Sequence, residues 1–361
     1  MQSLSVSGVL FAVGCLSLLL GLVPAHAQNR VGDGRVKSTG EISAAGQKNA
    51  PLGGPRQTAV TSGQGQRKLP PGFPISKQHE EFVVRLLHHW EKQSAKIERY
   101  RCGFTRYEYN PVLGPGVNAQ TGVLPARTKS FGKIMYAAPD KGLFRVDEVT
   151  HYRPGKQSGG KAQYVKHEAE HGEHWVCDGV RVFEFRHHQK ELVQIELPPE
   201  MHGKGIVDGP LPFLFGAEAQ KILDRYWVHT ITPKDAAERK EYWLEVFPKS
   251  QSDAASYRMV HVIIDKYILP KAIRIFAPNY HPKTNRTSTL FVFDDREQNW
   301  STIPEKLNLF HRAFHKPKMP DGWKLVPYTQ AGMAATRNAS RTSEQSRPAE
   351  RSGVSQETRS R

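Results

Sequence analysis

Apolar and polar residues alternate through most of the middle of this chain, and this alternation constrains its fold more than any other feature. Tyr100, Cys102 and Phe104 fall on alternate positions, and Phe291 and Phe293 flank Val292 in the same way. Period two is typical of half-buried strands, because successive side chains in a strand point to opposite faces. Strands are predicted near 100–106, 129–137, 142–152, 163–177, 180–187, 190–197, 226–232, 241–248, 259–267, 271–277 and 287–294. This pattern predicts a large antiparallel sheet.

Two helices are expected beside the sheet. Ser76 can cap a first helix that runs from about Ser76 to Ile97. Its apolar residues recur at three- and four-residue spacing and form one stripe: Phe82, Val83, Leu86, Leu87 and Trp90. A second helix is expected at 217–223, after a segment bounded by glycines at 209–216, and a short element near 307–314 closes the domain. The fold class is α+β.

The N-terminus is predicted to be an export signal. Residues 4–23 are almost wholly apolar, and Ala25 and Ala27 supply the small residues of a signal-peptidase site. Residues 1–27 are therefore expected to be a signal peptide, which places the mature protein in the periplasm or cell envelope. An uncleaved anchor is the alternative, because the apolar run is nearly long enough to span a membrane.

Half of the net charge of +16 lies in the two flanks of the chain. Residues 28–72 hold seven Lys/Arg against two acids, and residues 327–361 hold six against three. Both flanks are poor in aromatic residues, so they are predicted to be a disordered linker and a disordered basic tail. The intervening residues, 73–326, suit one domain. No dense basic run is present there, so no nucleic-acid partner is expected.

Two cysteines, Cys102 and Cys177, remain after removal of the signal. An exported chain can join such a pair in one disulfide. In a simple strand meander, however, the two strands that carry them would not be neighbours, and their Cα separation could exceed the reach of a disulfide. Two small buried thiols are the alternative.

Several short motifs follow one another in a fixed order behind the first predicted helix. They are Pro139-Asp140-Lys141-Gly142-Leu143-Phe144-Arg145, then Cys177-Asp178-Gly179 before an aromatic strand, then Pro210-Leu211-Pro212-Phe213-Leu214-Phe215, and finally Leu244-Glu245-Val246-Phe247-Pro248. In this order they resemble the LolA/LolB-like superfamily of outer-membrane lipoprotein carriers, and within it an uncharacterised exported bacterial branch. The resemblance runs from the first helix to the last strand.

This resemblance implies an open half-barrel of curved antiparallel sheet, covered by the N-terminal helix and by a mid-chain lid helix. It further implies that the concave face binds acyl chains of lipids or lipoproteins. Aromatic residues of the strands and of the lid segment are the candidate lining: Phe104, Phe144, Trp175, Phe183, Phe213, Phe215, Trp243 and Phe291. A closed hydrophobic core would use the same residues.

A zinc site is the main rival hypothesis. His167-Glu168-Ala169-Glu170-His171 matches the H-E-x-x-H pattern, and His174 lies close by. That chemistry needs a helix, whereas Gly172 and the segment that follows it favour strand and turn. In a strand, His167 and His171 would stand about 13 Å apart, too far for one metal ion.

The chain also lacks a G-x-S-x-G nucleophile elbow, so no catalytic residues and no cofactor are predicted. The function favoured by the sequence is a non-enzymatic, exported lipid-binding protein. The alternatives are a zinc-dependent hydrolase built on the His167 and His171 motif, and a basic envelope protein that contacts an anionic membrane surface or polysaccharide.

Overall fold

The computed structural model describes residues 67–73, 76–118, 122–154, 163–166, 172–197, 199, 202, 218–300 and 309–328. The helices are α2 (Lys77–Ser94), α3 (Ala219–Arg225), α4 (Lys234–Glu238) and α5 (Gln251–Ser256). The strands of the first half are β1 (Arg99–Tyr109), β2 (Thr128–Ala137), β3 (Lys141–Arg153), β4 (Gln163–Lys166), β5 (His174–Cys177), β6 (Arg181–Arg186) and β7 (Glu191–Glu196). Those of the second half are β8 (Tyr226–Thr230), β9 (Tyr242–Pro248), β10 (Met259–Ile264), β11 (Pro270–Phe276), β12 (Ser288–Gln298) and β13 (Lys324–Tyr328).

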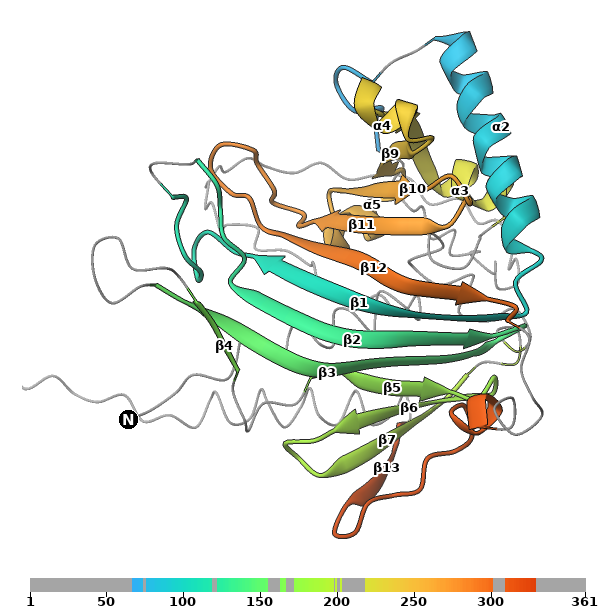
Figure 1. Cartoon of the computed structure of the whole chain (residues 1–361), viewed down its shortest axis with the longest axis vertical. Helices are drawn as coiled ribbons and strands as arrows, with labels where there is room; N and C mark the ends of the chain where they lie inside the picture. Colours follow the sequence, from blue (N-terminus) through green and yellow to red (C-terminus); the bar gives the residue numbers. More distant parts are fainter. Residues whose placement is uncertain are drawn as a thin grey trace, which may run out of the picture.

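All thirteen strands belong to one open sheet (Figure 1). The strand order is β13-β7-β6-β5-β3-β2-β1-β12-β11-β10-β9-β8, and β4 pairs with β3 off this path. Every neighbouring pair is antiparallel except β13 and β7, which are parallel. The two end strands, β13 and β8, are not paired with each other, so the sheet does not close into a barrel. The α+β class and the open antiparallel sheet expected from the sequence are confirmed.

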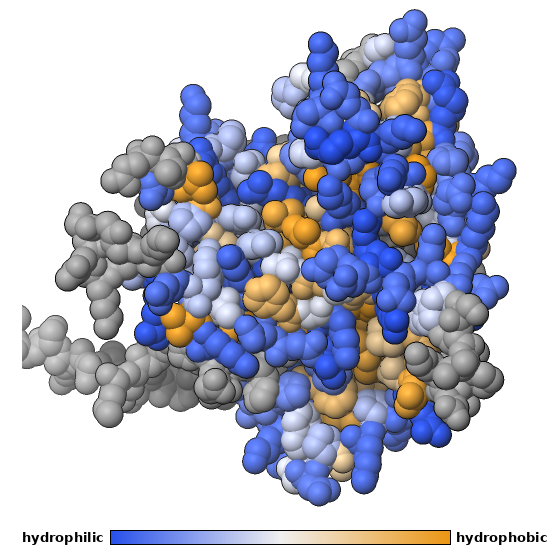
Figure 2. All heavy atoms as spheres, viewed as in Figure 1, coloured by the Kyte–Doolittle hydropathy of each residue, from blue (hydrophilic) through white to orange (hydrophobic). Residues whose placement is uncertain are grey.

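The register of the strands divides the side chains between two faces of the sheet. Directly paired residues share a face, and the face alternates along each strand. We call the face that carries Cys102 and Phe104 the inner face, because both belong to the largest buried hydrophobic cluster. The opposite face, which carries Tyr107 and Lys129, is called the outer face. On the side of the molecule shown in Figure 2, apolar residues form separate patches between hydrophilic ones.

Helices α2 and α3 cover the inner face at the β8 end of the sheet (Figure 1). The apolar stripe of α2 is confirmed at Val83, Leu86, Leu87 and Trp90, which are all buried. Phe82 departs from that expectation: it is 39% exposed and lies at the edge of the stripe, against Tyr242. Ser76 occupies the N-cap position as expected, but its side chain makes no capping hydrogen bond.

At the opposite end of the sheet, a second cluster forms on the outer face. Phe310 and Phe314 pack there against Leu143 and Val176, beside the strands β3 and β5. The short helical turn at 309–312 is the closing element expected near 307–314. Phe310 and Phe314 therefore cover the outer face at this end. Because β3 and β5 also carry apolar residues on the inner face, these strands lack a clean polar and apolar alternation.

Several elements differ from the sequence prediction. The strand expected at 163–177 is two strands, β4 and β5, whose connecting residues 167–171 lie outside the described part. Helices α4 and α5 and strand β13 were not predicted. Strand β13 ends at Tyr328, two residues after the domain boundary expected at 326.

The disulfide considered between Cys102 and Cys177 is not formed, and both residues are buried free thiols. Cys102 lies on β1 and Cys177 on β5, and strands β2 and β3 separate them. Three strand spacings amount to about 14 Å, well beyond the reach of a disulfide. The simpler alternative of two buried thiols is therefore correct.

Within the described ranges, no helix is long and apolar enough to cross a membrane. The predicted signal peptide (1–27), nearly all of the linker (28–72) and the tail after Tyr328 lie outside those ranges, so they remain sequence predictions. The last linker residues are described. The Arg67 guanidinium donates a hydrogen bond to the carbonyl oxygen of Pro248, which attaches this segment to β9.

Candidate apolar binding face

A row of aromatic rings crosses the inner face over four strands. Phe291 of β12 lies 5.7 Å from Phe104 of β1, measured between ring centroids. Phe104 stacks on Phe144 of β3 at 5.0 Å, and Phe144 stacks on Trp175 of β5 at 5.7 Å. Offset stacking of this kind adds to the free energy of area burial. The four residues form the aromatic row, the central feature of the candidate site.

Gly132 makes the aromatic row continuous. It is the residue of β2 that pairs with Phe104, so it separates the inner-face positions of β1 and β3. A Cβ atom at Gly132 would lie 2.6 Å from the Phe104 ring and 2.2 Å from the carbonyl oxygen of Arg145. Because glycine leaves this space empty, the Phe104 ring lies across β2 and reaches Phe144.

The four members of the aromatic row are half of the lining predicted from the sequence. Two others point elsewhere: Phe183 pairs with Val176, and Trp243 pairs with Ile263, so both lie on the outer face. Their strands carry large apolar residues on both faces, so the alternation in the sequence could not show on which face of the sheet each residue lies. Phe213 and Phe215 lie outside the described residues.

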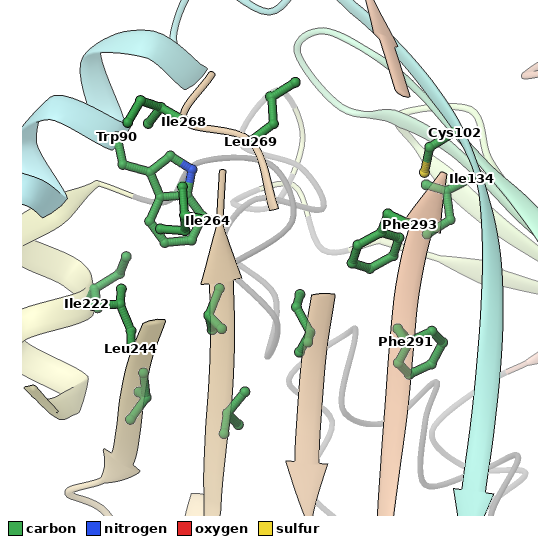
Figure 3. Packing of buried hydrophobic residues seen from close by; sticks show 14 of the residues in the cluster. Trp90, Cys102, Ile134, Ile222, Leu244, Ile264, Ile268, Leu269, Phe291 and Phe293 are labelled. Atoms are coloured by element: carbon green, nitrogen blue, oxygen red, sulfur yellow. The ribbon is translucent and has the colours of Figure 1, made fainter. Parts of the chain in front are cut away.

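The apolar surface continues from the aromatic row toward the helices (Figure 3). Trp90 of α2 and Ile222 of α3 point toward the strand residues Ile264 and Leu244, while Phe291 lies farther along the sheet. All of these residues belong to one buried cluster. The helices make their main contacts with the sheet at β8, far from β3 and β5 in the strand order.

Beyond Phe104 along β1, polar residues enter the inner face over two further rows of paired residues. Next to the row that contains Phe104 lies Arg106, which pairs with Ser130 on one side and with Phe291 on the other. The following row holds Glu108, paired with Thr128 and with Thr289. Successive rows are about 7 Å apart.

Sequence reasoning missed Arg106 as a site residue, although alternation in the first predicted strand already placed it on the side of Phe104. It is a buried cation, and only 8% of its side chain is exposed. Its Nη1 donates to Oε2 of Glu173 at 2.6 Å, and its Nε lies 3.3 Å from Oε1 of Glu108. The hydroxyl of Thr128 donates to Glu108 at 2.7 Å. Two carboxylates thus compensate one guanidinium.

The histidines proposed for a zinc site are not brought together in the described structure. His174 lies on the outer face of β5, where its ring stacks on Phe185 at 3.9 Å. Burial, followed by the nearby positive charge of Arg145, lowers the pKa of His174 to about 4. His167 and His171 lie outside the described residues. Among the residues that are described, no three His, Cys, Asp or Glu side chains form a group that could hold a metal ion.

Comparison with known proteins adds only distant structural neighbours. No protein-family model and no curated protein matches the chain. A solved structure of an uncharacterized conserved protein from Thermus thermophilus is 8% identical, covers 69% of this chain and 99% of its own, and has a TM-score of 0.33. A LolA superfamily protein from Nitrosomonas europaea is 9% identical over 64% and 97% of the two chains, with a TM-score of 0.29. LprF from Mycobacterium bovis is 8% identical over 62% and 96%, with a TM-score of 0.28.

The superfamily that the sequence motifs resemble is therefore also found among the structural neighbours. At these identities and TM-scores, the likeness carries no argument about the activity of this chain. What the site can do is taken from its own inner face: an open sheet, an aromatic row and a polar end.

Proposed function

We propose that this protein is a non-enzymatic carrier or sensor that binds acyl chains of lipids or lipoproteins on the inner face of its sheet. The observation that carries the proposal is the aromatic row of Phe291, Phe104, Phe144 and Trp175, which continues into the apolar cluster beneath α2 and α3. An acyl chain gains about 0.8 kcal/mol for each buried methylene, so its affinity should rise with the length of chain that contacts these residues.

The openness of the sheet supports the proposal. A closed barrel limits the size of its own interior, whereas a sheet with two unpaired ends can change its curvature and admit a ligand. Trp175 is only partly buried, so the β5 end of the aromatic row is the accessible one. Export follows from the predicted signal peptide at 1–27, and it would place the protein in the periplasm or cell envelope, where acyl chains need a carrier through water.

The first test is fluorescence quenching of the mature chain, residues 28–361, by an acyl ligand that carries bromine on its chain. Bromine quenches tryptophan at contact distance, and we expect saturable quenching that falls sharply in Trp175→Phe. The matched control is Trp243→Phe, because Trp243 lies on the outer face of the same sheet. Equal quenching of both variants, or none in the wild type, would contradict the proposal.

Native mass spectrometry of the purified chain, with organic extraction of the same sample, gives an independent result. We expect bound acyl species that organic solvent releases. A mass without any acyl adduct, combined with a bound metal that is lost in His167→Ala, would instead favour the hydrolase hypothesis.

A further inference from the structure

The polar end of the inner face contains a hydroxyl group that the fold leaves without a partner. Ser130 is 1% exposed, and its Oγ has no hydrogen-bond partner in the structure. It points into the same space as its register partner Arg106, one row from Phe104. Because an unsatisfied buried hydroxyl costs free energy, such a group in a native sheet calls for an explanation.

The surroundings of Ser130 restrict the chemistry of any group that binds there. The fixed charges are the guanidinium of Arg106 and the carboxylates of Glu173 and Glu108, which sum to one negative charge at neutral pH. An anionic headgroup would be repelled by this excess. A cationic headgroup would find both carboxylates already bound to Arg106. A neutral group that accepts a hydrogen bond meets neither obstacle.

Exposure to solvent also increases from the row of Phe104 to the row of Glu108, as the binding of an amphiphile requires. Phe104 and Ser130 are buried, whereas Glu108 in the last row is 36% exposed at its side chain. An acyl chain that contacts Phe104 and turns along β1 toward Glu108 would reach solvent at this end. Its headgroup would then lie beside Ser130 and Arg106, one row or about 7 Å along the strands from Phe104.

We propose that Ser130 and Arg106 form a subsite for an uncharged ester headgroup, so that the preferred ligand is an acylglycerol rather than a free fatty acid. This inference rests on the proposed function, because the acyl chain must lie on the aromatic row. In the complex, the Ser130 hydroxyl donates to the ester carbonyl oxygen. Arg106, held in place by Glu173 and Glu108, keeps the surroundings of Ser130 polar without adding net positive charge.

The test compares three probes of equal chain length on the mature chain: a monoacylglycerol, the free fatty acid and the alkylamine. Binding is measured by competition against the brominated ligand. We expect the monoacylglycerol to bind about fivefold more tightly than either charged probe, or better. If all three fail to bind, the proposed function is wrong. If the charged probes bind as tightly as the ester, only the headgroup subsite is wrong.

Ser130→Ala separates a binding role from a structural one. We expect this variant to bind the monoacylglycerol about fivefold more weakly, which corresponds to one neutral hydrogen bond, while affinity for the charged probes stays the same. Its thermal midpoint without ligand should not fall, because the removed hydroxyl has no partner to lose. Ser288→Ala is the matched control, since Ser288 is a buried serine on the outer face of β12. Unchanged ester affinity in Ser130→Ala would overturn the subsite.

Discussion

In the middle of strands β9 and β10, the residue pairs on the two faces of the sheet differ in kind. Leu244 and Val262 pair on the inner face and are fully buried. Glu245 and His261 pair on the outer face of the same strands, one position along. There, Glu245 accepts hydrogen bonds from Nε2 of His229 at 2.7 Å and from Nε2 of His261 at 2.8 Å.

This difference separates two sources of stability in one sheet. The inner face depends on area removed from water, a term that changes little with pH. Around Glu245 the outer face depends instead on individual pairs, in which the protonation of one side chain decides the free energy. Substitutions of buried aromatic residues on the inner face should therefore alter both stability and ligand binding. Substitutions on the outer face should alter the pH dependence of stability and leave acyl binding unchanged.

The largest effect is expected from Phe104→Ala, in the middle of the aromatic row. Removal of this buried ring should lower the free energy of unfolding by about 3–5 kcal/mol, because both transfer free energy and packing with Phe144 are lost. Tyr107→Ala, on the outer face of the same strand, should cost about 1 kcal/mol or less. Urea denaturation of the two variants measures the difference. Equal losses would show that the two faces contribute alike.

Gly132→Ala is expected to have the next largest effect. The added methyl group would meet both the Phe104 ring and the carbonyl oxygen of Arg145, so ring and strand must shift. We expect a loss of about 1–3 kcal/mol in the free energy of unfolding, the range for overpacking. Gly116→Ala is the control, because a Cβ there meets nothing within 4 Å. A Gly132 variant as stable as this control would mean that the ring does not lie across β2.

The sheet could be predicted from the sequence because its strands alternate over long stretches, and the first helix because its stripe is regular. β13 was missed because it is short, contains Pro327 and pairs in parallel with β7. α5 could have been predicted: Ser250 and Asp253 form the spacing of a capping box, and the Asp253 backbone N–H donates to Ser250 Oγ at 3.0 Å. α4 has five residues and no comparable cap.

Only half of the candidate site was predictable, because alternation along a strand shows the face of a residue only where one face is apolar and the other polar. Phe104 lies in a strand with one apolar face, so alternation assigns it to the inner side. Phe291 shares β12 with Leu290 and Val292 of the opposite face, so alternation alone does not assign it. Trp243 lies in a strand where Leu244 and Phe247 make both faces apolar, and tertiary packing decides the outcome. The subsite at Ser130 was not predictable, because pairing with Arg106 requires the register between β1 and β2.

The outer-face pairs should determine how the protein responds to acid. Burial opposes ionisation of Glu245, but hydrogen bonds from His229 and His261 outweigh it and lower the pKa of Glu245 to about 2. A depressed carboxyl pKa contributes stability above the unfolded value near 4.5, and this contribution is lost as pH falls through 2. Glu245→Gln should remove about 1–2 kcal/mol at pH 7 and flatten the stability profile between pH 4.5 and 2.

The matched control for Glu245→Gln is Glu297→Gln, whose carboxylate pairs with Arg101 at the exposed surface. We expect a change of about 0.5 kcal/mol or less there, because solvent screens such pairs. Acyl binding should be unaffected in both variants, since both residues lie away from the inner face. Denaturation at a series of pH values measures these profiles. An unchanged profile in Glu245→Gln would show that the pairs of Glu245 with His229 and His261 do not determine the response to acid.

The smallest expected effect on the pH dependence of stability comes from His174. There burial favours the neutral form of the side chain, whereas at Glu245 hydrogen bonds favour the charged form. Burial, aided by the positive charge of Arg145, lowers its pKa to about 4, so the folded protein holds this ring neutral. The unfolded chain binds its proton near pH 6.5, and stability should therefore fall as pH drops from 6.5 to 4. His174→Phe keeps the stacking on Phe185 but cannot be protonated. We expect it to remove about 1 kcal/mol of that acid-induced loss, measured by denaturation at neutral pH and again at about pH 4.5. A loss as large as that of the wild type would mean that protonation elsewhere dominates this end of the sheet.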